Sequence, residues 1–244
     1  MIRRYLVCAA LWLAAGMAHA APIADSIADF SNSQGQDGWF YGFFNQGADG
    51  STAYTTGAFT NFATYGFVGV DEWGATDVQV GAQNNDYLGL GSATGHPTGL
   101  EPDEQDSIIW AVRRYQSEVA GDIDIKIDLR KFNTNPDAGG ITGRVFIDGV
   151  EIYTQFVATT DDIGFQTTLV RNVALGSFID FAIDPLGVVH TRDNGEVDGI
   201  YSARADGTHF SALISPHVVP IAPTFLLVMG GLVGIVASRR HRRS

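Results

Sequence analysis

The chain contains almost no cysteine, and this scarcity limits its chemistry. Cys8 is the single cysteine among 244 residues, and it lies in an N-terminal segment that we expect to be removed. The mature protein would then have neither a disulfide nor a thiol nucleophile. A secreted domain without disulfides depends on its hydrophobic core, and residues 21–217 are long enough to form one core of substantial size.

The chain also lacks the short motifs that mark common catalytic sites. It has no Gly-x-Ser-x-Gly sequence, so that route to a serine hydrolase lacks its signature. No glycine-rich phosphate loop is present, because Gly89-Leu90-Gly91 is not followed by a helical pattern. The histidines of residues 21–217 do not have the spacing of a helical zinc pair, and we interpret them as structural: His96, His190, His209 and His217. The sequence therefore predicts no catalytic residue.

Positive charge is scarce outside the two ends of the chain. All 27 acidic residues lie within residues 21–217, whereas this region holds only nine of the 15 basic residues, which gives it a net charge of −18. Such a surface repels nucleic acids and anionic lipids. It suits an extracellular domain, and its carboxylates are of the type that collects calcium.

The N-terminus has the three parts of a secretory signal peptide. Basic residues open the chain, and an apolar run from Tyr5 to Met17 follows. Ala18 and Ala20 then provide the small-x-small cleavage pattern, so we expect cleavage before Ala21. Residues 1–20 are therefore predicted to direct export and to be removed.

The C-terminal tail, residues 218–244, combines a proline-containing start, an uncharged stretch from Thr224 to Ala237, and a basic cluster. An apolar helix rises about 1.5 Å per residue and a bilayer core is about 30 Å thick, so a helix counted from Val218 would just span the membrane. The arginines favour the cytoplasmic side, which places residues 21–217 outside that membrane. An ordinary single-pass anchor is one interpretation of this pattern.

The order of these parts also resembles the PEP-CTERM class of bacterial sorting signals, which exosortase-type membrane proteases process. The usual Pro-Glu-Pro is absent, and Val-Pro-Ile-Ala-Pro stands in its place, close to the variant that begins Val-Pro-Leu-Pro-Ala. The resemblance implies transient anchoring in the inner membrane and then location at the cell surface or in an extracellular matrix, with an exosortase-type protease as partner. It is carried by Val219, Pro220, Ile221, Ala222, Pro223, Arg239, Arg240, Arg242 and Arg243.

Between these two ends, the apolar pattern predicts an all-β fold of roughly ten strands. From Ile123 to Leu129, apolar residues alternate with charged ones, as in a strand with one buried face. Asp148-Gly149 between two apolar runs predicts a hairpin with a type I′ turn. We expect a β-sandwich or jelly roll, with an up-and-down barrel as the alternative. The two strands of that hairpin are expected at Val145–Ile147 and Val150–Tyr153. Further strands are expected at Trp39–Phe44, Ile108–Tyr115, Phe165–Val173, Phe178–Ile183, Gly199–Arg204 and His209–Ile214, and an exposed loop at Ser92–Asp106.

Several of these segments are similar to jelly-roll domains of secreted bacterial surface proteins, which are shaped like carbohydrate-binding modules. The resemblance covers most of residues 21–217 and implies a fold and a setting, but it carries over no catalytic residue. The segments concerned are Asp29–Ser31, Ala111–Tyr115, Gly121–Ile125, Arg144–Ile152 and Gly176–Asp184.

Two kinds of ligand-binding residue can be proposed from composition. Sugars stack on exposed aromatic rings, and the candidate platforms are Trp39, Tyr41, Trp73 and Tyr87, although most aromatic residues of such a domain belong to its core. A structural calcium ion, the one cofactor considered, needs about six to eight oxygen ligands. Its candidate ligands are Asn135, Asp137, Asp184, Asp193 and Asp198, in loops where Asn and Asp also serve turn geometry.

The sequence thus predicts an exported, non-enzymatic protein of the cell surface or of an exopolysaccharide matrix such as a biofilm, with exopolysaccharide as a possible partner and no nucleic acid. One alternative is a polysaccharide-acting hydrolase, which would use the acidic loop that contains Glu101, Asp103, Glu104 and Asp106 as a carboxylate pair. A second alternative is an adhesin that is stiffened by calcium.

Overall fold

The computed structural model describes residues 21–47, 49–66, 71–74, 88–100, 107–136, 138–191, 195, 197–199 and 206–219. The proposed signal peptide, the acidic loop 101–106 and the tail from Pro220 lie outside the described residues, so those expectations remain predictions. In the part of the chain that is described, no helix is long and apolar enough to cross a membrane. Val219, at the end of this part, is exposed.

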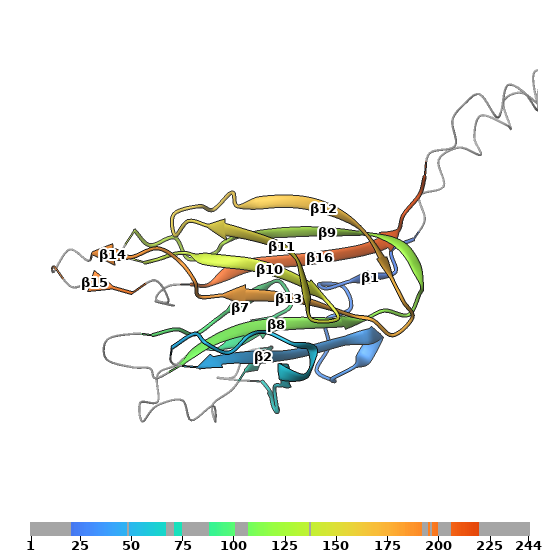
Figure 1. The fold of residues 1–244 in the computed structure, drawn as a ribbon, viewed down its shortest axis with the longest axis horizontal. Coiled ribbons are helices and arrows are strands. Elements are labelled where there is room, and N and C mark those ends of the chain that lie inside the picture. Colours follow the sequence, from blue (N-terminus) through green and yellow to red (C-terminus); the bar gives the residue numbers. More distant parts are fainter. Residues whose placement is uncertain are drawn as a thin grey trace, which may run out of the picture.

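Two antiparallel sheets stack into a β-sandwich, as the alternating pattern predicted (Figure 1). The first sheet has the order β12-β9-β16-β7-β6-β5-β4, with β1 also paired to β16. The second has the order β11-β10-β13-β8-β2-β3, and β14 and β15 form a separate small ribbon. The all-β prediction is confirmed for the described residues, whose only helical elements are the 3₁₀ turns η2 and η3.

The strands of the first sheet are β1 (Ala24–Asp25), β4 (Thr64–Tyr65), β5 (Glu72–Gly74), β6 (Gly89–Gly91), β7 (Thr94–His96), β9 (Gly121–Lys131), β12 (Phe165–Val173) and β16 (Thr208–Pro216). Those of the second are β2 (Trp39–Gly47), β3 (Thr60–Asn61), β8 (Ile108–Gln116), β10 (Ile141–Ile147), β11 (Val150–Val157) and β13 (Phe178–Asp184). The remaining elements are β14 (His190–Thr191), β15 (Val197–Asp198), η2 (Gln36–Gly38) and η3 (Thr56–Ala58).

The core lies between the two sheets and follows the two-residue period of the strands. On β9, the odd-numbered positions from Ile123 to Leu129 are buried, while Asp122 and Lys126 on the other face are exposed. Phe181 of the second sheet meets Phe210 of the first, with ring centroids 5.6 Å apart. The strand-period pattern therefore fixes which side chains hold the sheets together.

The hairpin between β10 and β11 turns at the residue pair that the sequence indicated. Asp148 has φ 50° and Gly149 has φ 82°, so both central residues occupy the left-handed region that a type I′ turn requires. The Asp148 carboxylate also accepts a hydrogen bond of 2.8 Å from the Phe178 N–H, which ties the turn to β13. The prediction of this hairpin is confirmed.

The expected exposed loop at Ser92–Asp106 is wrong in its first half. Residues 94–96 form β7, which pairs with β6 on one side and with β16 on the other. Thr98 then forms an isolated bridge with Ile109. These short strands are rich in glycine and threonine and show no apolar alternation, so only pairing with neighbouring strands reveals them.

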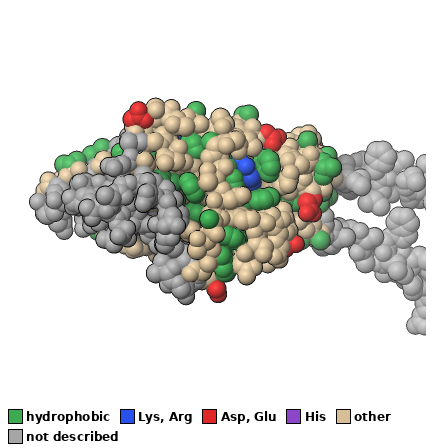
Figure 2. Space-filling view, turned by 90° about the horizontal axis from the view of Figure 1, so that it is seen from below, with side chains coloured by type: hydrophobic (Ala, Val, Ile, Leu, Met, Phe, Trp, Pro, Cys, Tyr) green, Lys and Arg blue, Asp and Glu red, His purple; other side chains and the backbone are tan. Residues whose placement is uncertain are grey.

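Figure 2 shows the molecule from below, and hydrophobic side chains appear there in small groups between polar atoms. The coloured Lys, Arg, Asp and Glu side chains on this side are few and isolated. The described residues on this side therefore present no broad patch of a single charge sign.

Candidate binding cavity

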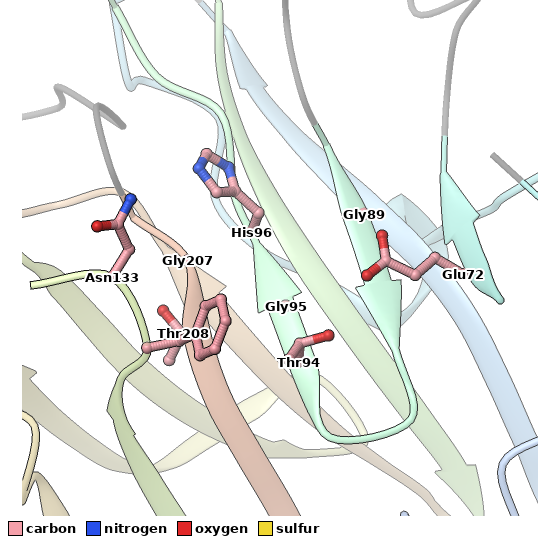
Figure 3. Close-up of a pocket in the computed structure, with 9 residues that line it drawn as sticks. Glu72, Gly89, Thr94, Gly95, His96, Asn133, Gly207 and Thr208 are labelled. Carbon is pink, nitrogen blue, oxygen red and sulfur yellow. The ribbon is translucent and has the colours of Figure 1, made fainter. Parts of the chain in front are cut away.

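A cavity of about 480 Å³ opens on the outer face of the first sheet. Leu90 of β6 and Trp73 of β5 are buried in the core, so their neighbours along each strand point to the opposite, outer face. The cavity spans β5, β6, β7 and the start of β16, and one wall follows the end of β9. Its lining consists of Glu72, Gly89, Thr94, Gly95, His96, Phe132, Asn133, Gly207 and Thr208 (Figure 3).

Several glycines leave the outer face of β5 and β6 without side chains, and one of them, Gly89, lines the cavity. Gly74 and Gly89 are register partners on β5 and β6, and Gly91 is the partner of Glu72, so all three glycines sit at outward positions. A Cβ atom at Gly91 would come within 2.5 Å of Thr94 Oγ1 and 3.1 Å of Glu72 Oε1. The hydroxyl and the carboxylate therefore converge over Gly91, and Figure 3 shows them pointing toward each other from β7 and β5.

Phe132 provides an aromatic wall. Its side chain is 63% exposed, although large aromatic side chains are usually buried. The ring contacts the His209 ring edge-to-face, with centroids 5.0 Å apart, and this contact orients it. Asn133, the next residue, is exposed and adds an amide beside the ring.

A buried ion pair supports this wall. Lys131 Nζ lies 2.7 Å from Asp206 Oδ1, and both side chains are fully buried. Burial lowers the pKa of Lys131, and the nearby Asp206 carboxylate opposes that shift. The Gly207 carbonyl accepts hydrogen bonds from the N–H groups of Phe132, at 2.9 Å, and Asn133, at 3.2 Å. The two chain segments that form the wall are thus fixed to each other.

His96 contributes an imidazole ring to the cavity lining. Its Nδ1 lies 2.6 Å from the Pro97 carbonyl oxygen. Because a carbonyl can only accept, Nδ1 carries the proton of this hydrogen bond. The sequence alone favours a structural role for this histidine, whereas the structure places it in the cavity lining.

The floor of the cavity is held from below by Arg113 of β8 in the second sheet. This side chain is buried, and its guanidinium donates to the carbonyls of Ser26 (2.9 Å), Ser92 (2.8 Å), Gly91 and Thr94 (3.2 Å). Three of these four carbonyls belong to the β6–β7 hairpin. Burial lowers the pKa of Arg113 to about 10. One arginine therefore joins the second sheet to the hairpin that forms the cavity floor.

The aromatic residues that the sequence suggested as sugar platforms lie elsewhere. Trp39 and Tyr41 have 0% exposure and Trp73 has 5%, so none presents a ring face to solvent, and the prediction is wrong for these three. The Tyr41 and Trp73 rings stack 5.7 Å apart in the core, and the Trp73 Nε1–H donates to the Ser31 carbonyl at 2.8 Å. Tyr87 lies outside the described residues.

The calcium candidate Asp184 is engaged within the domain. This buried carboxylate accepts hydrogen bonds from Arg144 Nε at 2.8 Å and from the Leu186 N–H at 2.9 Å, and the calcium expectation stays a prediction. Asp137 and Asp193 lie outside the described residues, and Asp198 lies on β15. The Asn135 carbonyl accepts from the Thr159 hydroxyl. Among the described side chains, no three His, Cys, Asp or Glu residues cluster as metal ligands.

The alternative catalytic pair falls on residues 101–106, which lie outside the described residues. Glu72 is the one carboxylate among the described residues that line the cavity. A glycosidase requires two carboxyl groups, about 5–10 Å apart, on either side of the scissile bond. The described part of the cavity lining therefore contains a single carboxylate.

No protein-family model matches the chain, and no curated protein has a similar sequence. Several solved structures share a limited likeness. A β-glucosidase from Kluyveromyces marxianus in complex with glucose is 10% identical, with a TM-score of 0.32, over 84% of this chain and 20% of that one. A ruminal GH26 endo-β-1,4-mannanase is 11% identical, with a TM-score of 0.30, over 62% of this chain and 24% of that one.

A CBM51 domain from Clostridium perfringens in complex with methyl-galactose is 13% identical, with a TM-score of 0.27, over 58% of this chain and 90% of that one. The chain spans about a quarter or less of the length of the two enzymes. Since all these TM-scores lie below 0.5, the assignment of the cavity depends on its own geometry.

Proposed function

We propose that the protein is an exported, non-catalytic carbohydrate-binding protein, and that the cavity on its first sheet is the binding site. The observation that carries this proposal is the exposed ring of Phe132 beside Asn133, His96 and Glu72, above a backbone floor formed by glycine. A sugar unit has an apolar face of C–H groups and a periphery of hydroxyls. In the cavity, the Phe132 ring can cover the apolar face and the polar side chains of the lining can bind the hydroxyls.

The ring face supplies the apolar part of the binding energy. Covering an exposed aromatic ring with an apolar surface contributes about 1–2 kcal/mol, and a well-placed hydrogen bond to a charged group adds about 1.5–3 kcal/mol. Because the ion pair of Lys131 with Asp206 and the Gly207 carbonyl hold the wall in place, little ordering is needed on binding. Preorganisation of this kind favours ligand recognition by a passive domain.

The charge distribution and the two chain ends support location outside the cytoplasm. The pattern of residues 1–20 supports secretion, and the tail supports transient inner-membrane anchoring followed by exosortase-type processing. In this proposal the mature domain is displayed at the cell surface or in an extracellular matrix, where exopolysaccharide is its partner. Intact-mass measurement of the protein from its host should find a C-terminus that lacks Arg243. Retention of Arg243 would contradict the processing step.

The binding step can be tested with the full chain in detergent on an array of diverse glycans. The Phe132→Ala variant should bind any glycan that the unmodified chain binds at least tenfold more weakly, because the stacking surface is gone. Phe156→Ala is the matched control, since Phe156 is also an exposed phenylalanine but lies on β11 of the second sheet. Equal binding by both variants, or binding of no glycan, would contradict the proposal.

A further inference from the structure

We propose that β12, the open edge of the first sheet, pairs with β12 of a second copy of this chain to form an antiparallel dimer. This surface is separate from the cavity, so the dimer forms whether or not the cavity binds a carbohydrate. Figure 1 shows β12 at the outer margin of the sandwich, and no described strand pairs with its free side. The contrast with the other sheet edges, the direction of the β12 backbone groups and the sequence of the strand each support this pairing.

Unpaired strand edges invite association, and the other edges of this sandwich carry features that oppose it. β4, at the far end of the first sheet, and β3, at one end of the second, are only two residues long. β11, at the other end of the second sheet, contains a bulge, because its pairing with β10 shifts between Val145 and Phe146. β12 has nine residues that pair with β9 without a shift, and it contains no proline, glycine or lysine. Among the described strands that end the two sheets, β12 is therefore the one that is both long and regular.

The pairing of the neighbouring strands shows which backbone groups of β12 point outward. On β16, the Ala212 carbonyl accepts from the Ser26 N–H at 2.9 Å, and the Ile214 carbonyl accepts from the Ile23 N–H at 2.7 Å. Even-numbered residues of β16 thus face away from β9, and its odd-numbered residues bond to even-numbered residues of β9. The odd-numbered residues of β9 then bond to odd-numbered residues of β12. The backbone N–H and C=O groups left for a partner belong to Gln166, Thr168, Val170 and Asn172.

The polar side chains of β12 leave this edge uncovered. Gln166 Nε2 donates to Asp128 Oδ2 at 3.1 Å, and Asn172 Nδ2 donates to Asp122 Oδ1 at 2.8 Å. Both acceptors lie on β9, so the two amides lean toward the sheet and away from its free edge. A second strand can therefore approach the outward backbone groups without displacing these side chains.

The charge of the strand also suits pairing with itself. Region 21–217 has a net charge of −18, yet the sequence from Phe165 to Val173 contains no acidic residue and one basic residue, Arg171. Arg171 Nη1 donates to the Val170 carbonyl at 2.8 Å, in accord with the outward direction of that carbonyl. The oxygen has a second lone pair for another donor. Two copies of this edge therefore meet without opposed carboxylates.

A twofold axis through Leu169, perpendicular to the sheet, gives the register that uses every outward group. The opposed pairs are then Gln166 with Asn172, Thr168 with Val170, and Thr167 with Arg171. The four pairs of outward residues form about eight backbone hydrogen bonds, two for each pair, and no like charges are directly opposed. Each copy contributes the same edge, so the assembly closes at two chains. Both cavities then lie on one face of the continuous sheet, which gives a polysaccharide two binding sites if the proposed function holds.

Analytical ultracentrifugation of the full chain in density-matched detergent measures the oligomeric state. We expect a dimer whose fraction rises with salt, because salt screens the repulsion between two acidic copies. Thr168→Pro removes one outward N–H and leaves the bonds to β9 in place, so it should weaken the dimer about tenfold or more. Val170→Lys should also weaken it, because two ammonium groups then lie diagonally across the axis. Val150→Lys is the matched control, since Val150 is also an exposed valine but lies on the bulged edge β11, and it should dimerise like the unmodified chain.

Disulfide cross-linking tests the register. The two copies of Leu169 form a pair without mutual hydrogen bonds, with Cα atoms about 4.5 Å apart, which suits a disulfide. A chain with Cys8→Ser and Leu169→Cys should therefore form a covalent dimer in oxidised glutathione, seen on a non-reducing gel. Leu175→Cys in the same background is the control for random collision, because Leu175 is exposed and follows the end of β12. It should cross-link far more slowly.

Each outcome bears on one part of the proposal. The mass of a single chain at every protein concentration up to about 100 μM would overturn the dimer. A dimer that persists unchanged in both Thr168→Pro and Val170→Lys would overturn the β12 interface, since another surface or the tail would then join the copies. Failure of Leu169→Cys to cross-link, or equal cross-linking of Leu175→Cys, would overturn the register.

Discussion

Replacement of Arg113 by methionine tests whether a single buried cation joins the two sheets. Methionine has a similar length and is tolerated in cores, so the substitution removes the guanidinium with little change in volume. The carbonyls of Ser26, Gly91, Ser92 and Thr94 then lose their donor in a place that water does not reach freely. The perturbation is therefore a loss of hydrogen bonds with packing nearly preserved.

The size of the effect follows from those four acceptors. Each buried carbonyl without a donor costs about 1–3 kcal/mol, and the removal of a desolvated charge offsets part of the total. The rings of Phe30 and Phe210, whose centroids lie 5.6 and 5.1 Å from the guanidinium carbon, also lose a cation–π contact. We expect the free energy of unfolding to fall by about 3–5 kcal/mol.

Thermal unfolding followed by circular dichroism measures this change. For a domain of this size, a loss of 1 kcal/mol lowers the melting temperature by about 2–4 °C, so the Arg113→Met variant should melt about 6–20 °C below the unmodified chain. Arg130→Met is the control, because Arg130 is exposed on β9, and its melting temperature should change by less than about 2 °C. A variant at Arg113 that melts with the unmodified chain would refute the bridging role.

Three further predictions concern other buried or strained groups. Lys131→Met should lower the free energy of unfolding by about 3–5 kcal/mol, because the buried Asp206 loses the charge of Lys131. Lys131→Met with Asp206→Leu should recover most of this loss in urea titrations, and equal stability of the single and double variants would contradict it. Burial raises the pKa of Asp184 from 3.8 to about 6 against the opposing effect of Arg144, so its stabilising contribution is present below pH about 4 and lost as the pH rises through about 6. The stability difference between the unmodified chain and Asp184→Asn should therefore shrink by up to about 3 kcal/mol from pH 4 to pH 7, and a constant difference would argue against this coupling. Gly149→Ala should destabilise the chain by about 1–2 kcal/mol, since φ is 82° and the new Cβ lies 3.0 Å from the Thr56 nitrogen; a neutral effect in the same titrations would show that the turn relaxes.

The sequence predicts the long strands well because local pattern and tertiary burial agree there. The alternation from Ile123 to Leu129 gives both the existence of β9 and the identity of its buried face. The Asp148-Gly149 pair gives the turn type, since few residues adopt positive φ in succession. At β9 and at this turn, the local sequence pattern is therefore enough to predict the backbone conformation.

Prediction from the alternation of apolar and polar residues fails for strands that are buried on both faces. On β8, Arg113 and Arg114 look like exposed positions, yet both are buried, one against backbone carbonyls and the other against Asp180. Trp39 and Tyr41 lie on β2, where sequence alternation could not show which ring would face solvent, and contacts with the first sheet bury both. Such environments depend on chain segments far away in sequence, so local patterns do not contain them.

Phe132 is the residue that sequence reasoning could have found. The exposed face of β9 holds the even-numbered positions, and extending that period by one step beyond Lys131 places Phe132 on the exposed face. The rest of the cavity could not be anticipated, because Glu72, Gly91 and Thr94 meet only through the pairing of three short strands. The site therefore depends on the pairing register of β5, β6 and β7, and no local sequence motif marks it.

A crystal structure of the chain bound to an oligosaccharide that it binds on the array would test the carbohydrate site most directly. The account predicts that one sugar ring packs against Phe132 and that its hydroxyls donate to Glu72, over the glycine floor of the cavity. Density for the oligosaccharide on any other surface, with this cavity empty, would contradict it.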